Sequence, residues 1–445
     1  MTTTPIEKST IRKMYRRLIP LLFAMVFFSY LDRSNIGYGQ LDMGKQLGFG
    51  PAVFGFAGSI FFVGYMVMQI PSNLILYRLG ARRWISILLI AWGAVAATLA
   101  FVSGDTGLYV MRFLLGLMEA GLLPGIAIYA TTWFPAAYRA RAVSGYIVGG
   151  TFATVLGGPL STSLMTYANN LFGLRGWQWM FLIEGAAAVV VGIVAVRVMT
   201  ERPADAAWLT PEEKSWLAAA HEADRNSRDN SASFLRMLTD ARMWSLSVLF
   251  GCVLVGIYGL MLWLPQIIKD FGHLSNIQVG FLAAVPPLLG VAGTFIVGVS
   301  SDRTGDRKKH LAAVCGLTAL AIAGSAYAPS PVVAYVLLCV AGLCIYAVTP
   351  LFWSLASSFT VGAAGAATVA LINCIAQFGG VIGPWSIGLV RSSTGNFALA
   401  LVTIAGFLLV TTIIALAMPV RRESATALPR ADSHGNFTLV ADSPD

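Results

Sequence analysis

Long apolar stretches recur along the whole chain, and short polar stretches separate them. A helix needs about 20 apolar residues to cross a bilayer core of about 30 Å. Because lipid offers the backbone no hydrogen bonds, a stretch of this length is expected to be helical. The pattern predicts twelve membrane-spanning helices, at about residues 18–39, 52–75, 84–103, 107–130, 142–165, 177–199, 242–268, 276–299, 310–328, 331–354, 363–389 and 396–418.

The composition agrees with a membrane protein. Hydrophobic residues occupy 57% of the 445 positions and charged residues 11%, and the mean hydropathy is +0.72. A soluble domain carries about 25% charged residues. The sequence lacks the alternation of apolar and polar positions that is typical of a membrane β-barrel. The expected fold class is therefore an all-α polytopic membrane protein.

A polar stretch at residues 200–241 divides the twelve spans into six and six. Inside it, Thr210 is suited to an N-cap, Pro211 to a first turn and Glu213 to the third position of a capping box, so a short cytosolic helix is expected there. The expected organisation is a cytoplasmic N-terminal segment, an N-terminal six-helix bundle, a cytoplasmic central loop, a C-terminal six-helix bundle and a cytoplasmic tail, at residues 1–17, 18–199, 200–241, 242–418 and 419–445.

Lysine and arginine are concentrated in the N-terminal segment, in the loops after the second, fourth and eighth spans, and in the tail. By the positive-inside rule, both termini are expected to be cytoplasmic, in a bacterial inner membrane. This clustering also accounts for the net charge of +9. We therefore expect these basic loops to lie against the lipid bilayer, and we expect no binding of nucleic acid.

The loop between the second and third spans is repeated in the second half. The 8–9 loop reads GVSSDRTGDRKK from Gly298, and the 2–3 loop reads NLILYRLGARRW from Asn73. Arginines and a glycine fall at the same offsets, although Tyr77 stands where the first copy would need the aspartate. Two such loops indicate a duplicated six-helix unit.

The duplicated loop on a six-plus-six layout resembles the major facilitator superfamily of secondary transporters. The stretches RFLLGLMEAG from Arg112 and GGTFATVLGGP from Gly149 are similar to further motifs of that superfamily. The resemblance implies two pseudo-symmetric six-helix bundles that rock about a central site. It also implies a cytoplasmic gate at the repeated loop, with the residues Arg78, Arg82, Arg83, Asp302 and Arg303. One chain would contain both bundles, so a monomer is expected.

Several further stretches resemble one branch, the anion:cation symporter family. They are YLDRSNIG, IPSNL, GWQWMFLIEG, YGLMLWLPQII, PLFW and LINCIAQFGGVIGP, beginning at Tyr30, Ile70, Gly176, Tyr258, Pro350 and Leu371. This resemblance implies import of a small organic anion, such as a sugar acid, tartrate or an aromatic acid, together with protons.

Five ionisable residues lie inside the predicted spans, all in the N-terminal half: Asp32, Arg33, Arg112, Glu119 and Glu184. At 1.5 Å per residue, Asp32 lies about 21 Å along its span and Glu119 about 18 Å along its own, which runs the other way. Arg112 and Glu119 are seven residues apart and share a helix face. Because charges are costly in lipid, we expect the first four to face one cavity and to hold one another ionised.

Carboxylate chemistry suggests how these charges could work. Burial disfavours an ionised carboxyl group, and a nearby guanidinium favours it. If a substrate carboxylate takes the planar fork of Arg33, Asp32 and Glu119 lose a counter-ion and bind protons more readily. Substrate and proton binding would then favour each other, as coupling requires.

The family resemblance implies the same roles: Asp32 and Glu119 as proton-coupling residues and Arg33 as the substrate-binding residue. We assign Arg112 to Glu119 and to the electrostatics of the substrate site. Purely structural ion pairs are the alternative for Asp32 and Glu119. Glu184 is expected to serve packing or helix pairing.

Uncharged residues are expected to orient the ligand, since a few polar groups in an apolar cavity fix how a small molecule binds. The resemblance favours Tyr65, Trp353 and Asn373, and Gln377 and Tyr30 are further candidates; packing is the alternative for each. In the fifth span, Val148, Gly149 and Gly150 stand where sugar-acid carriers can present an amide. A less hydroxylated anion, aromatic or dicarboxylic, is therefore favoured.

Other functions remain as alternatives. A uniporter or exchanger of the same fold is the nearest, and a membrane sensor of the acid would need a longer signalling domain than residues 421–445. The four histidines lie in loops or the tail, so neither an enzyme nor a metal or other cofactor is expected.

Overall fold

The computed structural model describes residues 4–226, 240–357, 362–418, 430–431 and 437–438. Within these residues, twelve helical segments are long and apolar enough to cross a membrane, which confirms the predicted number of spans. The N-terminal half contains α1 (Pro5–Leu47), α2 (Pro51–Leu79), α3 (Ala81–Thr98), α4 (Asp105–Glu119), α5 (Leu122–Trp133), α6 (Ala136–Tyr167) and α7 (Gly176–Val198). The C-terminal half contains α10 (Ala241–Lys269), α11 (Asn276–Thr304), α12 (Arg307–Ala326), α13 (Pro331–Ser357), α14 (Gly362–Ala376), α15 (Phe378–Thr394) and α16 (Ala398–Ala417).

The shorter elements lie in the connections and the tail. The central polar stretch forms α8 (Pro211–Asn226). Three 3₁₀ turns are η1 (Leu99–Phe101), η2 (Leu171–Gly173) and η3 (Pro203–Asp205), and the strands β1 (Arg430–Ala431) and β2 (Phe437–Thr438) pair antiparallel.

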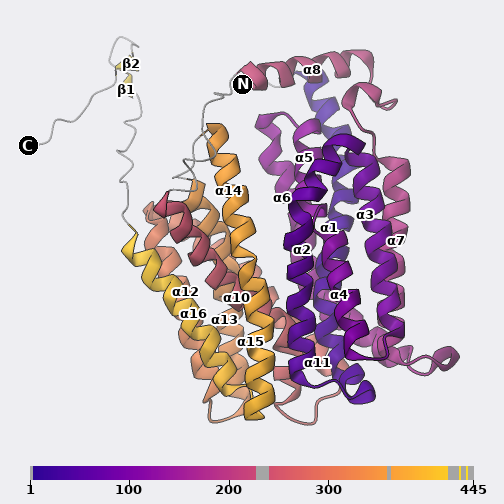
Figure 1. Ribbon diagram of the computed structural model, residues 1–445. Coiled ribbons are helices and arrows are strands. Elements are labelled where there is room, and N and C mark those ends of the chain that lie inside the picture. The colour runs from indigo at the N-terminus through magenta and orange to yellow at the C-terminus, as the bar shows by residue number, and fades with distance from the viewer. Residues whose placement is uncertain (1–3, 227–239, 358–361, 419–429, 432–436, 439–445) are drawn as a thin grey trace, which may run out of the picture.

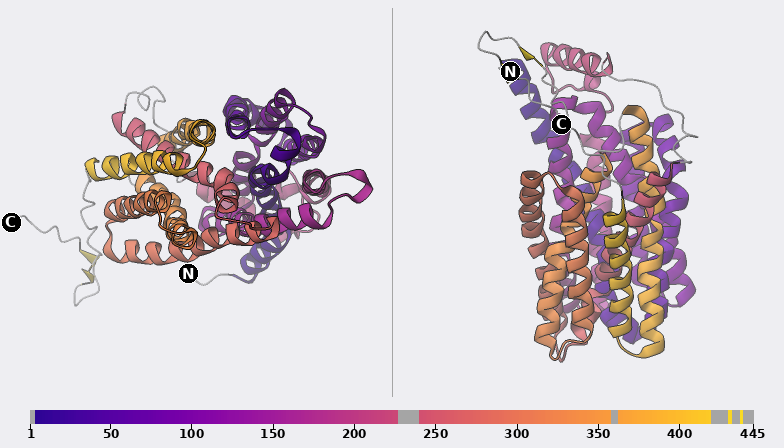
Figure 2. Two further views of the ribbon diagram at one scale, coloured as in Figure 1. Left: turned by 90° about the horizontal axis from the view of Figure 1, so that it is seen from below. Right: turned by 90° about the vertical axis from the view of Figure 1, so that its left-hand side faces the viewer.

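The helices form two bundles that lie side by side (Figures 1 and 2). The N-terminal bundle contains α1 to α7 and the C-terminal bundle α10 to α16. Three helix pairs join them: α2 with α15, α6 with α11 and α1 with α10. The central site is therefore framed by helices from both halves of the chain.

The bundles meet at the end of the molecule opposite α8. There Asn276 donates a hydrogen bond to Asp42 at 2.8 Å, and Ser59 donates one to the carbonyl of Val381 at 2.5 Å. A Cβ on Gly158 would collide with the carbonyl of Gly280, so glycine is what permits this close approach.

Toward the α8 end, the ribbons of the two bundles diverge (Figure 1). The face of α2 that carries Ser59 continues, at helical spacing, to Ile70 and Tyr77. These two side chains are 65% and 74% exposed, whereas Ser59 is 2% exposed. The interface is thus closed at one end and open at the α8 end.

Helix α8 packs on the N-terminal bundle. Thr210 caps it as predicted, since its hydroxyl accepts a hydrogen bond from the Glu213 amide at 3.3 Å and its own amide donates to the Glu213 carboxylate at 3.0 Å. Lys13 forms an ion pair with Glu213 at 2.9 Å. Just before α8, the ring of Trp208 stacks on Trp133 with centroids 5.2 Å apart.

Two of the predicted spans are each built from two helices. The fourth breaks between α4 and α5, where Gly121 lies so close to Ser72 that a Cβ would not fit. The eleventh breaks at Gln377, whose backbone N–H is shared between the backbone carbonyls of Asn373 and Cys374, each at 3.3 Å. Glu119 is the last residue of α4, so the first break lies directly at the charged site.

Candidate functional site

The centre of the site is an ion pair between α1 and α4. Arg33 Nε donates to Glu119 Oε1 at 2.6 Å, and the two side chains are 4% and 0% exposed. The hydroxyl of Ser29, one helical turn before Arg33, donates to the same carboxylate oxygen. Glu119 Oε2 and Arg33 Nη2 are buried and have no hydrogen-bond partner among the described residues. The pair therefore leaves one donor group and one acceptor oxygen available.

Aromatic rings surround the Arg33 guanidinium. Its carbon lies 5.1 Å from the ring centroid of Tyr65, 5.4 Å from that of Tyr30 and 5.7 Å from that of Phe61. From the C-terminal bundle, the hydroxyl of Tyr258 lies 3.5 Å from Nη1. Tyr65 and Tyr30, both candidates from the sequence for orienting the ligand, thus lie beside Arg33. Such rings stabilise a desolvated cation without neutralising it.

Arg112 lies near Glu119 without a direct contact to it among the described residues. Its Nε donates to the carbonyl of Ala57 at 3.3 Å, its guanidinium lies 4.9 Å from the Phe61 centroid, and Nη1 has no partner within the described part of the chain. No described ion pair joins it to Glu119, because Arg33 takes that carboxylate. The ring of Phe61, between α1 and α4, contacts both guanidinium groups.

Both guanidinium groups line a small cavity of about 20 Å³ between the bundles. This volume holds one or two water molecules. Phe61 and Phe62 form its N-terminal wall, and residues of α10 and α15 form the other. The cavity places two cations at the bundle interface.

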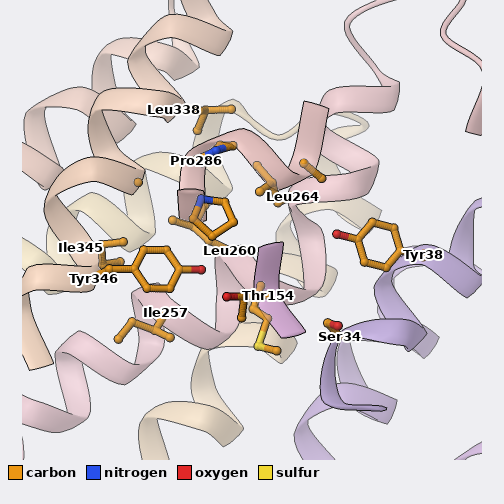
Figure 3. Close-up of a pocket in the computed structure, with 14 residues that line it drawn as sticks. Ser34, Tyr38, Thr154, Ile257, Leu260, Leu264, Pro286, Leu338, Ile345 and Tyr346 are labelled. Atoms are coloured by element: carbon orange, nitrogen blue, oxygen red, sulfur yellow. The ribbon is translucent and has the colours of Figure 1, made fainter. Parts of the chain in front are cut away.

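A second cavity, of about 60 Å³, is shown in Figure 3. It shares the lining residue Met261 with the first cavity. Most of its wall is apolar and comes from α10, α11 and α13. Four hydroxyl-bearing residues, from α1, α6 and α13, also line it: Ser34, Tyr38, Thr154 and Tyr346. A few hydroxyls in an apolar wall suit the uncharged body of a small ligand.

Asp32 lies away from Arg33, on another side of α1. Its Oδ2 accepts from Trp92 Nε1 at 2.8 Å and its Oδ1 from Asn35 Nδ2 at 2.9 Å. Asn35 Nδ2 also donates to Glu184 Oε2 at 3.0 Å, and Ser161 Oγ lies 2.7 Å from Glu184 Oε1. The structure thus joins Asp32 to Glu184, a contact that the sequence analysis missed. Asn35, in the same short stretch as Asp32, was the available signal.

The candidates in the C-terminal bundle lie apart from both cavities. Trp353 is half-buried and contacts the rings of Phe250 and Phe352, with centroids 5.2 and 5.0 Å away. Asn373 is half-buried near the end of α14. Gln377 is buried, and its Oε1 has no partner in the described residues. None of the three lines either cavity in this conformation.

The predicted gate residues lie at the α8 end. The guanidinium of Arg82 donates to the carbonyl of Val196 at 2.8 and 2.5 Å, inside the N-terminal bundle. Arg78, Arg83, Asp302 and Arg303 are exposed. No hydrogen bond or ion pair links the gate residues of the two bundles among the residues described, in agreement with an interface that is open at this end.

Two six-helix bundles with a charged site enclosed between them define a secondary membrane transporter. The chain belongs to the Major Facilitator Superfamily, whose model matches residues 22–384. It is a transporter rather than an enzyme. Within the described residues, no group of three or more histidine, cysteine or acidic residues could hold a metal ion.

Relatives over nearly the whole chain are also transporters. A "Putative tartrate transporter" of Agrobacterium vitis is 41% identical over 93% of this chain and 95% of its own. A "Quinolone resistance transporter" of Acinetobacter baumannii is 37% identical over 89% and 91%, and the "Inner membrane transport protein RhmT" of Escherichia coli is 32% identical over 95% and 98%.

Two solved structures have the same fold. One is a bacterial homologue of the human lysosomal transporter Spinster, inward-facing and occupied, with a TM-score of 0.74 and 17% identity over 91% of this chain and 96% of that one. The other is a D-xylose–proton symporter, with a TM-score of 0.73 and 14% identity over 90% and 97%.

Proposed function

We propose that this transporter imports a small organic anion, a carboxylate, together with protons, by alternating access to the site between the bundles. The observation that carries the proposal is the buried Arg33 guanidinium, which is held by Glu119 at one nitrogen and faces a cavity lined by both bundles. Guanidinium groups bind carboxylates through two parallel hydrogen bonds. The ligand class is therefore an anion.

Coupling follows from competition for Arg33. A substrate carboxylate that binds this guanidinium withdraws it from Glu119, whose second oxygen already lacks a partner within the described chain. An ionised carboxylate left alone in a buried site is costly, so Glu119 takes a proton. Substrate and proton are then carried together, and Asp32 is the second proton-coupling residue.

The cavity also supports a substrate class. Arg33 and Arg112 both line it, on the two sides of Phe61, and two guanidinium groups favour a ligand with two negative charges. Gly149 and Gly150 pack against Phe23 and Tyr30, so α6 offers no amide there. A short dicarboxylate fits these features, and two relatives carry the name "Putative tartrate transporter".

The basic loops support the orientation. Arg78, Arg83 and Arg303 lie at the α8 end, which we assign to the cytoplasm with both termini. The membrane is the bacterial inner membrane, and the functional unit is a monomer. In this orientation the interface between the bundles is open at its cytoplasmic end and closed at its outer end.

The test uses the purified protein in liposomes that enclose a pH-sensitive dye. Tartrate, phthalate, a sugar acid and hydroxyphenylacetate are added outside in turn, without an imposed gradient. We expect acidification of the lumen with one acid, tartrate being the first candidate. The same signal is expected to vanish in the Arg33→Ala variant.

Other outcomes would separate the alternatives. Uptake of radiolabelled acid without proton movement would make the protein a uniporter or an exchanger. Transport of a neutral or cationic drug in preference to every acid would overturn the anion assignment.

A further inference from the structure

Asp32 and Glu184 form a buried pair of carboxyl groups that, unlike Glu119, has no arginine partner among the described residues. Asp32 and Glu184 are 3% and 4% exposed, and neither takes part in an ion pair among the described residues. The side chain of Asn35, fully buried, bridges them: it donates one hydrogen bond to each carboxyl group, at 2.9 and 3.0 Å. Two ionised carboxylates joined through one amide would repel each other in a medium that already disfavours each of them.

The surroundings of Glu184 supply no compensating charge. From α1 it is faced by Asp32 and, within electrostatic range, by Tyr38. From α6 it is faced by the uncharged Ser161. Helix α3, which packs closely on α7, gives Trp92 to Asp32; its arginines, the nearer being Arg83, lie about 14 Å or more further along the helix.

Among the described residues, the two side chains that contact the Asp32 carboxyl group are both hydrogen-bond donors. An indole N–H and an amide NH₂ can only donate, and together they occupy both carboxylate oxygens of Asp32. Glu119 and Arg112 of α4 act on Asp32 with opposite signs and from beyond ion-pair distance. The hydrogen bonds of Asp32 are therefore those of an ionised carboxylate.

Glu184 has a partner of another kind. Ser161 Oγ donates to Glu184 Oε1 at 2.7 Å, but a serine hydroxyl can also accept, so the direction of this bond reverses when Glu184 carries a proton on that oxygen. Its other oxygen accepts from Asn35. With Asn35 oriented as in this structure, Glu184 contacts a hydroxyl that can accept a hydrogen bond, whereas Asp32 contacts two donors.

We propose that Asp32 and Glu184 hold one proton between them, coupled through Asn35, and that Glu184 carries it in this conformation. The second proton site thus comprises two carboxyl groups, and Glu184 is a proton-holding residue and not a packing residue. The inference extends the proposed function, which gives Asp32 a proton, but its test requires no transport.

Infrared difference spectroscopy of the purified protein tests this assignment, because a protonated carboxyl group has its own C=O stretching band. At neutral pH we expect such a band in the wild type and none of it in Glu184→Gln, which keeps the shape and both hydrogen bonds. Ser161→Ala should retain the band but shift its frequency, since the proton loses its acceptor. Glu119→Gln is the matched control and should retain the band, because Glu119 pairs with Arg33 and makes no hydrogen bond to Glu184 or Asn35 among the described residues.

Coupling is tested by titrating the band. Asp32→Asn removes the neighbouring negative charge, so Glu184 should release its proton at a pH about one unit or more lower than in the wild type. Persistence of the band in a folded Glu184→Gln protein, or an unchanged titration in Asp32→Asn, would overturn the proposal. Loss of anion transport would leave this result intact, so the two proposals fail separately.

Discussion

The interiors of the two bundles differ in kind. The N-terminal bundle buries five ionisable residues: Asp32, Arg33, Arg112, Glu119 and Glu184. In the described part of the C-terminal bundle, the buried polar residues are uncharged, and a stack of Phe250 on Phe352, with centroids 4.3 Å apart, lies at its centre. One bundle holds the charges, and the other presents an apolar and aromatic surface to them.

This difference shows how a transporter can limit the cost of buried charge. Arg33 is neutralised, surrounded by rings and hydrogen-bonded within its own bundle, so the second bundle can move without breaking an ion pair. Among the described hydrogen bonds, Arg33 makes one to the C-terminal bundle: Nη1 donates to the hydroxyl of Tyr258 over a long distance of 3.5 Å. A moving interface of this type needs no charged partner to be desolvated and resolvated in each cycle.

The largest effect is expected from Arg33→Ala. It removes the anion-binding group and leaves Glu119 buried without a counter-ion, and losses of this type cost about 2–5 kcal/mol, or roughly 30-fold to more than 1,000-fold in affinity. Equilibrium binding of the transported acid measures it. Arg33→Lys is the control, because it keeps the charge but loses the fork. Undiminished binding in Arg33→Ala would contradict the placing of the anion site in the N-terminal bundle.

Neutralising the acidic residues comes next. In Glu119→Gln and Asp32→Asn we expect accumulation against a gradient to fall by about ten-fold or more, while exchange of labelled for unlabelled acid is spared, because the proton-binding groups are lost and the guanidinium remains. Uphill uptake and exchange are measured on the same liposomes. If uphill uptake is unimpaired in both variants, these carboxylates do not carry protons.

A smaller and different effect is expected from the C-terminal bundle. Trp353→Ala loses edge contacts with two aromatic rings of its own bundle, worth about 0.5–1.5 kcal/mol, so the free energy of unfolding should fall by that amount while the affinity for the acid changes little. The number of protons carried per anion should not change. A changed proton ratio in this variant would mean that the two bundles do not divide the work as described.

The smallest effect is expected at the surface ion pair of Lys13 and Glu213. Burial alone raises the pKa of Glu213, but hydrogen bonds from Lys13, the Thr210 amide and Ser9 outweigh it and hold the pKa below its ordinary value of 4.5. Because its pKa is lowered in the folded protein, ionised Glu213 stabilises the docking of α8 above pH 4.5. This contribution is lost as the pH falls below that value and Glu213 becomes protonated.

The exposed position of Lys13 limits this contribution to about 0.2–1 kcal/mol. Amide hydrogen exchange of α8 should therefore be faster, relative to the intrinsic rate, at about pH 4 than near neutral pH. Glu213→Gln should remove this difference. If the exchange of α8 in Glu213→Gln depends on pH as strongly as in the wild type, the pH dependence arises from other groups.

Most of the fold could be predicted from the sequence, because spanning a bilayer forces long apolar helices and α8 begins with a capping box at Thr210. The breaks at Gly121 and Gln377 could not, since they depend on which neighbouring helix approaches. In the site, helical spacing and depth predicted the set of charges but not their partners. Asp32 and Arg33 are adjacent in sequence and diverge around α1, so that Arg33 reaches Glu119 while Asp32 contacts Trp92 and Asn35.

Helix α1 runs without interruption over 43 residues despite Pro20, a length of about 64 Å. It contacts α8 through Lys13, carries Ser29 and Arg33 at mid-length, and meets the other bundle through Asp42 near its far end. Such a rod acts as a lever: a rotation of roughly 10° about Arg33 would displace the turn at Lys13, about 30 Å away along the axis, by roughly 5 Å. A fluorescent probe on that first turn would therefore report events at the buried site from outside the membrane.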